Sequence, residues 1–170
     1  MRRRRVLRDG IVMMSTAFLA CSSDVVVHLV RHAEKAAGSD VDKKDPPLSD
    51  KGKERAAALA SALAAKPIAA VFATEYRRTQ ETVEPIATAK NLPLKIVNAS
   101  DTKELVRLIR EHPGKEVLVA GHSNTVPEIA KELGLSEEIA LEDDAFGDWF
   151  VLRAASKSAS VERRRFDPGS

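Results

Sequence analysis

The 170-residue chain is poor in aromatic residues and in cysteine. Phe, Trp and Tyr together make up 4% of it, so the core must be built mainly from Val, Leu, Ile and Ala. The single cysteine, Cys21, excludes an intrachain disulfide. No cluster of His, Cys and Asp has the spacing of a zinc site, and no Gly-rich loop carries a phosphate-binding lysine. We therefore expect neither a metal nor a cofactor.

What the chain does contain is the composition of a globular protein, with 44% apolar and 31% charged residues. Its formal net charge of +2 is unevenly spread, because residues 1–20 hold five arginines against one acidic residue, Asp9. The remaining residues carry a net charge of −2, which argues against a nucleic acid as partner. At this length we expect residues 21–170 to form one domain. The sequence leaves the oligomeric state open.

Residues 1–20 have the pattern of an export signal. The arginines precede a ten-residue apolar run at 11–20, which is shorter than the roughly 20 residues that span a bilayer. Cys21 stands between a small residue and a serine, which resembles the lipidation site of bacterial lipoproteins. We predict a signal peptide over 1–20 and an exported lipoprotein, periplasmic or held at the outer membrane through Cys21. The alternative is a basic tail that leads into a first helix.

Beyond Cys21, strand-like and helix-like segments alternate. Near-continuous apolar runs rich in β-branched residues predict strands that are buried on both faces, as in a parallel sheet. The pattern therefore predicts an α/β fold, a three-layer sandwich with a mainly parallel central sheet flanked by helices. The expected strands are 25–30, 68–73, 94–97, 117–120 and 149–152, and the expected helices are 50–65, 76–90, 101–112 and 127–134. Pro85 should disturb the second helix, and the tail after Ala155 is left as an edge strand or a loose end.

Several polar or charged residues follow the expected strands directly. Because ligands bind at the carboxyl ends of parallel strands, these residues should meet at one edge of the sheet. Arginine forks match phosphoryl oxygens, and a neutral imidazole can attack phosphorus. Each residue alone has a structural explanation, but together they predict a phosphoryl-transfer site. The residues are Arg31 and His32 after the first strand, Thr74, Arg77 and Arg78 after the second, and His122, Ser123 and Asn124 after the fourth.

The same residues resemble the motifs of the histidine phosphatase superfamily, which has the phosphoglycerate mutase-like fold. The similarity covers Val30–Glu34, Thr74–Thr82, Val119–Ser123 and the Pro47–Gly52 segment, with Thr74 where serine is usual. The resemblance implies that His32 is the nucleophile of a phosphohistidine intermediate. It also implies that the phosphoryl group is bound by Arg31, Arg78 and His122, with Asn124 as a further contact and Thr74 as a structural hydroxyl. The motif spacing selects Arg78 rather than its neighbour Arg77.

The proton donor for the leaving group is the open point. Asp101 and Glu34 are the two candidates, although Asp101 can equally cap the following helix and Glu34 can orient an arginine or the backbone. Asn124 likewise has N-capping as an alternative. A site without a strong acid would favour good leaving groups, such as the imidazole of phosphohistidine.

The sequence therefore predicts a metal-independent phosphatase that acts on a phosphomonoester or a phosphoramidate. Its partner would be a phosphorylated small molecule or a phosphohistidine protein, and it would meet a membrane only through a lipid anchor. The alternatives are a phosphomutase and a non-catalytic, phosphate-binding lipoprotein. Selectivity should reside in the loops 36–48, 98–103 and 135–147, while His28 should be a buried, hydrogen-bonded part of the first strand.

Overall fold

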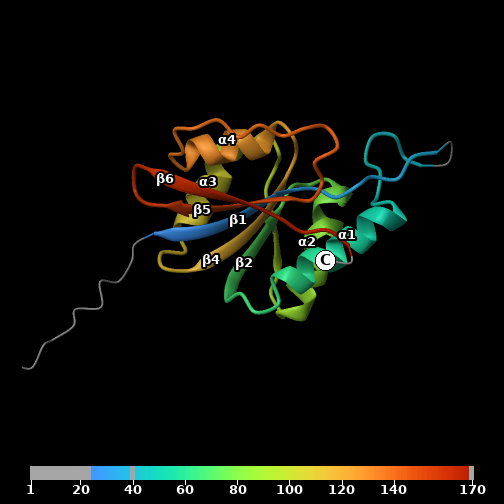
Figure 1. Cartoon of the computed structure of the whole chain (residues 1–170), viewed down its shortest axis with the longest axis horizontal. Helices are drawn as coiled ribbons and strands as arrows, with labels where there is room; N and C mark the ends of the chain where they lie inside the picture. Colours follow the sequence, from blue (N-terminus) through green and yellow to red (C-terminus); the bar gives the residue numbers. More distant parts are fainter. Residues whose placement is uncertain (1–23, 39–40, 169–170) are drawn as a thin grey trace, which may run out of the picture.

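The computed structural model describes residues 24–38 and 41–168 (Figure 1). The predicted signal peptide and Cys21 lie outside these residues and stay predictions. No helix in the described part of the chain is long and apolar enough to cross a membrane. In chain order the elements are β1 (Val25–Arg31), α1 (Asp50–Ala62), β2 (Ile68–Ala73), α2 (Arg77–Ala89), β3 (Leu94–Ile96), α3 (Thr102–Arg110), β4 (Glu116–Gly121), α4 (Thr125–Glu132), β5 (Asp148–Ala154) and β6 (Ala159–Arg165).

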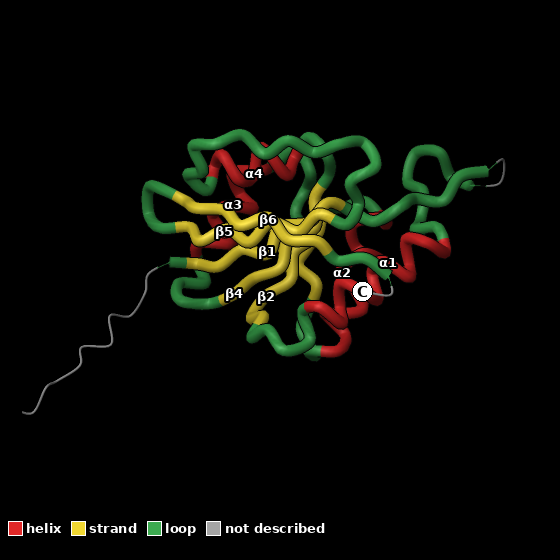
Figure 2. The backbone as a smooth tube through the Cα atoms, viewed as in Figure 1, coloured by secondary structure: helices red, strands yellow, loops and turns green. Residues whose placement is uncertain are grey.

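The strands form one sheet in the order β3-β2-β4-β1-β5-β6. The pairs β1·β4, β2·β4 and β2·β3 are parallel, whereas β5 and β6 run antiparallel to their neighbours. Helices α1 and α2 cover one face of this sheet, and α3 and α4 cover the other (Figures 1 and 2). The predicted α/β sandwich with a mainly parallel sheet is therefore confirmed.

The central strand β1 shows why its sequence is almost wholly apolar. Val27 and Leu29 pack into the core beneath α3 and α4, and Val30 packs into the core beneath α1 and α2. A strand that is covered on both faces cannot alternate apolar and polar residues, so the continuous run is its signature. The polar exception is His28, which is only 1% exposed. It hydrogen-bonds Glu116 through Nε2 and accepts the indole N–H of Trp149 at Nδ1, as expected of a structural histidine.

Several element boundaries differ from the expected ones. Strand β1 extends to Arg31, which pairs with Gly121 of β4 in the ladder. Helix α2 continues past Pro85 to Ala89, so the proline does not end it. Helix α4 begins at Thr125, and Pro127 still lies in its first turn, where a missing N–H costs little.

The tail that the sequence left open forms the edge strand β6. Its residues are mostly half-buried or exposed, so no apolar pattern marked it. The aromatic side chains of β5 hold it in place. The guanidinium groups of Arg163 and Arg164 lie over the rings of Phe150 and Trp149, at 5.8 and 5.4 Å from the ring centroids.

Candidate active site

A cavity of about 370 Å³ lies at the carboxyl ends of β1, β2 and β4. Four of the predicted site residues, Arg31, His32, Arg78 and His122, come together in its wall, with the predicted contact Asn124. No carboxylate is among the described residues that line it. The full lining is Arg31, His32, Lys35, Tyr76, Arg78, Ala99, His122, Ser123, Asn124, Thr125 and Phe146.

A hydrogen bond to the backbone fixes the tautomer of His32. Its Nδ1 lies 2.8 Å from the carbonyl oxygen of Ala33, which can only accept, so Nδ1 carries the proton. The lone pair is therefore on Nε2. Desolvation by burial lowers the pKa of His32 to about 4, although the bond to Ala33 opposes this shift. His32 is thus neutral near pH 7, the state in which an imidazole attacks phosphorus.

The backbone around His32 is held by two neighbouring elements. Its N–H donates to the carbonyl of Gly121 at the end of β4, 2.9 Å away. The next N–H, of Ala33, donates at 2.9 Å to the hydroxyl of Thr82, which in turn donates to the carbonyl of Arg78. Thr82, the last threonine of the 74–82 motif, therefore has a structural function, because it couples the segment around His32 to α2.

The second histidine, His122, stands edge-on to His32, with ring centroids 5.4 Å apart. Its Nε2 lies 2.9 Å from the hydroxyl of Thr74, and that hydroxyl lies 2.8 Å from the hydroxyl of Thr79. Thr79 donates to the carbonyl of Tyr76 at 2.8 Å, so Thr74 donates to Thr79 and accepts from His122. Thr74 therefore orients His122, which is a structural function for its hydroxyl.

The electrostatic environment keeps His122 neutral in the unliganded pocket. Desolvation by burial, followed by the charges of Arg78 and Arg31, lowers the pKa of His122 to about 4. A phosphoryl dianion in the pocket would offset those positive charges and raise the pKa again. The positive charge of the unliganded site is thus supplied by the arginines.

Arg31 is held from one side by the loop before β5. Its Nη1 donates to the carbonyls of Glu142 and Asp143, at 3.2 and 2.9 Å, and its guanidinium lies 4.4 Å from the centroid of the Phe146 ring. Its Nε is buried and has no hydrogen-bond partner among the described residues. A phosphoryl oxygen is the acceptor that would satisfy this N–H.

Arg78 enters the cavity from the first turn of α2. Its guanidinium lies over the ring of Tyr76, 4.4 Å from the centroid, and 3.9 Å from a carboxylate oxygen of Asp45. The adjacent Arg77 instead pairs with Glu81 along the helix at 3.2 Å. The structure therefore brings Arg78, and not Arg77, to the cavity, as the motif spacing indicated.

Neither candidate proton donor lines the cavity. Both carboxylate oxygens of Glu34 accept hydrogen bonds from Arg55 at 2.8 Å. Burial alone would raise the pKa of Glu34, but these bonds hold it below its ordinary value. Asp101 caps α3 through the N–H of Glu104, at 3.1 Å, and so takes its structural alternative. The structure therefore places neither carboxyl in the cavity wall, and the identity of the proton donor stays a prediction.

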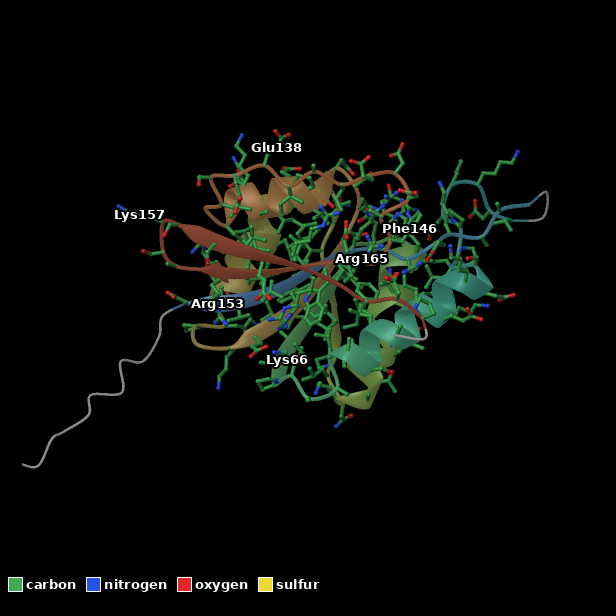
Figure 3. All side chains as sticks on the ribbon, viewed as in Figure 1. Lys66, Glu138, Phe146, Arg153, Lys157 and Arg165 are labelled. Atoms are coloured by element: carbon green, nitrogen blue, oxygen red, sulfur yellow. The ribbon has the colours of Figure 1, made fainter. Side chains whose placement is uncertain are left out.

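The cavity wall also contains Asn124 and several residues that were not predicted. Asn124 is the N-terminal cap residue of α4 by position, but its side chain makes no capping bond and lines the cavity. Lys35, Tyr76 and Phe146 were not singled out from the sequence. Tyr76 lies within a recognised motif, and in a chain with so few aromatic residues that position was a usable signal. Phe146 (Figure 3) lies in the loop 135–147, which the sequence predicted to carry selectivity without singling out a residue.

Across residues 24–38 and 41–168, no three His, Cys, Asp or Glu side chains come together in a way that could hold a metal ion. The histidines and arginines of the cavity are instead suited to a phosphate-sized anion, since they supply ring and guanidinium N–H donors.

Comparisons with known proteins agree with this geometry. Residues 27–105 match the family model of the histidine phosphatase superfamily (branch 1). Of the curated proteins that were compared, none matches the chain. The part of the chain that includes His32 and Arg78 is thus similar to the histidine phosphatase superfamily.

Solved structures of low sequence identity share the fold. The protein histidine phosphatase SixA, complexed with tungstate, is 19% identical with a TM-score of 0.64, over 84% of this chain and 97% of that one. Phosphoglycerate mutase from Bacillus anthracis is 14% identical with a TM-score of 0.66, over 85% and 94%. A mycobacterial glucosyl-3-phosphoglycerate phosphatase is 12% identical with a TM-score of 0.60, over 88% and 100%.

Proposed function

We propose that this protein is a metal-independent phosphatase in which Nε2 of His32 accepts the phosphoryl group of the substrate. The observation that carries the proposal is the pairing of a neutral His32, with Nδ1–H held on Ala33, and a cavity wall that supplies Arg31, Arg78 and His122. Nucleophile and anion-binding groups are thus present in one cavity before substrate binds, which is what catalysis by positioning requires.

The proposed reaction has two steps. The lone pair of Nε2 forms an N–P bond while the P–O or P–N bond breaks, and the leaving group departs with that electron pair and takes a proton from solvent. Water then attacks the phosphorus of phosphohistidine and releases a proton to solvent, the N–P bond breaks with its electron pair returning to Nε2, and phosphate leaves. In both steps Arg31, Arg78 and protonated His122 stabilise the charge on the equatorial oxygens.

The composition of the cavity wall favours a particular class of leaving group. Since no carboxylate is among the described residues that line the cavity, an alkoxide leaving group would find no acid in the cavity wall. An imidazole or phenol departs with less help, so phosphohistidine in a protein or peptide and aryl phosphates are the favoured substrates. The similarity of fold to a protein histidine phosphatase is consistent with this preference.

The test is to trap the intermediate. The protein is incubated with an aryl phosphate or a phosphohistidine peptide, quenched in base, and digested to locate an acid-labile phosphoryl group. We expect it on His32, with loss of both label and turnover in His32→Ala. His112→Ala is the matched control, since His112 does not line the cavity. Full activity of His32→Ala would overturn the proposal.

The same experiment separates the two alternatives. A binding protein would take up inorganic phosphate but show no label and no turnover over a panel of esters. A phosphomutase would pass the label to an added phosphoglycerate faster than to water. Water as the preferred acceptor is the result that the phosphatase requires.

A further inference from the structure

The segment from Pro47 to Gly52, which opens α1, is a recognised motif but contributes nothing to the cavity wall. This segment instead contacts the backbone of Glu34, two residues after His32. The N–H and hydroxyl of Ser49 both donate to the carbonyl of Glu34, at 2.9 and 3.2 Å. A Cβ on Gly52 would stand 2.2 Å from that carbonyl oxygen, so only glycine lets the helix approach so closely. The start of α1 therefore holds the backbone that follows the nucleophile.

One turn further along α1, Arg55 binds the side chain of the same residue. Its Nε and Nη2 donate to the two carboxylate oxygens of Glu34, each at 2.8 Å, in a bidentate pair. Arg55 is 7% exposed. Buried ion pairs seldom stabilise a fold more than apolar packing would, because both charges lose their hydration. Such a pair two residues from a nucleophile therefore calls for a reason other than stability.

The third nitrogen of Arg55 reaches the C-terminal segment. Its Nη1 donates to a carboxylate oxygen of Asp167 at 2.8 Å and to the carbonyl of Phe166 at 3.4 Å. Phe166 is buried, and its N–H donates at 2.9 Å to the carbonyl of Gly147. A Cβ on Gly147 would lie 2.9 Å from Nη1 of Arg55 and 2.7 Å from Asp167. The guanidinium thus packs directly against the backbone of residue 147.

That backbone carries the residue that holds Arg31. Phe146 immediately precedes Gly147, and its ring lies 4.4 Å from the guanidinium of Arg31. In Figure 3 it stands on the loop before β5, at the end of the sheet away from Lys157. One buried guanidinium therefore contacts both the segment that follows His32 and the loop that orients Arg31.

We propose that Arg55 is a positioning residue of the active site: it fixes the spacing between the nucleophile segment, through Glu34, and the loop that places Arg31, through Phe166, Asp167 and Gly147. This inference rests on the proposed function, because it assigns Arg31 to the phosphoryl group. It gives Glu34 a role as the partner of Arg55 in place of proton donor.

The test measures oxyanion affinity, which needs no turnover. Tungstate binding to the purified protein is titrated calorimetrically, at a temperature where thermal unfolding shows every variant to be folded. We expect Arg55→Met to weaken binding about tenfold, a typical size for coupling through packed groups. Arg55→Lys should recover little, because an ammonium cannot bridge both partners. Arg107→Met, which removes two exposed ion pairs, is the matched control and should bind as the wild type does.

A double-mutant cycle separates positioning from mere loss of stability. In an Arg31→Met background, Arg55→Met should cause no further loss of tungstate affinity, since Arg31 is the group through which Arg55 acts. An equal further loss in that background would overturn the inference. Should Arg55→Met not fold, Asp167→Asn replaces it in the cycle with a smaller expected loss, because the Asp167 side chain is 44% exposed.

The pH profile gives a second readout. If Glu34 were the proton donor, Glu34→Gln would remove the alkaline limb of kcat, whereas a positioning role leaves the shape of the profile unchanged and weakens tungstate binding. Wild-type protein that binds no tungstate would overturn the proposed function and this inference together. Wild-type binding that Arg55→Met retains in full would overturn the inference alone.

Discussion

The rings of His32 and His122 stand edge-on with centroids 5.4 Å apart, and the pKa of each is lowered to about 4. Desolvation by burial is the largest cause for both. Two neutral imidazoles can therefore lie close together in a cavity that already holds two guanidinium groups. The arrangement leaves one ring able to attack and the other able to take up a proton when an anion arrives.

The first prediction concerns the acid limit of activity. Protonation removes the lone pair of His32, so the acid limb that His32 causes in kcat/KM should lie near pH 4 and not near 6.5, the ordinary histidine value. Measuring kcat/KM for an aryl phosphate between pH 3.5 and 8 checks this, with the protein's folded state followed in parallel. An acid limb centred near 6.5 would contradict the lowered pKa.

Thr74 should be required for the orientation of His122. Thr74→Val removes the hydroxyl that accepts from Nε2, and we expect kcat to fall about tenfold or more. Thr74→Ser keeps the hydroxyl and is the matched control, with activity near that of the wild type. Steady-state kinetics of the two variants give the comparison. Equal activity of both would show that the contact of His122 with Thr74 is dispensable.

Asp101 should matter for stability and not for chemistry. Because asparagine caps helices as well as aspartate does, Asp101→Asn should change neither the free energy of unfolding nor kcat. Asp101→Ala should lose about 1 kcal/mol in urea denaturation with kcat again unchanged. A fall in kcat for Asp101→Asn that grows as the leaving group becomes more basic would instead show that Asp101 is the proton donor.

The buried pair of His28 and Trp149 should make the fold sensitive to acid. Desolvation lowers the pKa of His28 from 6.5, so the unfolded chain binds a proton more readily than the folded one, and stability falls as pH drops below about 6.5. His32 and His122 add to this loss down to about pH 4. Urea denaturation at pH 7.5, 6 and 5 measures the trend, and a flat profile would refute it.

Replacing the indole tests the same contact directly. Trp149→Phe removes the N–H that Nδ1 of His28 accepts at 3.0 Å and leaves a buried acceptor unsatisfied. We expect a loss of about 1–3 kcal/mol at pH 7.5 and a smaller further loss on acidification, since Nδ1 can then take a proton without breaking a bond. Phe150→Leu, a change on the opposite face of β5, is a control for lost ring packing and should keep the full acid dependence.

The predicted export signal is tested by the mass of the mature protein. Expression in a bacterial host should give a chain that begins at a diacylated Cys21 and partitions into detergent. Cys21→Ser should abolish both the added mass and the partitioning. A chain that keeps residues 1–20 would favour the alternative of a basic tail.

The sequence by itself determined the central strand of the sheet and the place of His32, the proposed nucleophile, at the end of that strand. Val25–Val30 was predictable as a strand buried on both faces, because it is a short, near-continuous apolar run rich in β-branched residues. Arg31 and His32 then had to stand at the edge where that burial ends. The convergence of His122 and Arg78 followed from the parallel order of strands, which brings residues far apart in sequence to one edge.

What only the tertiary structure decided depends on contacts across the chain. No local pattern indicates that Glu34 binds Arg55, that Phe146 lies over Arg31, or that the polar tail pairs as β6, since each contact joins residues from segments distant in sequence. The role of a charged side chain is set by its nearest partner, and partners are chosen by packing rather than by neighbours along the chain. For that reason, the residues able to bind phosphate could be read from the sequence, whereas the assignment of each carboxylate had to await the fold.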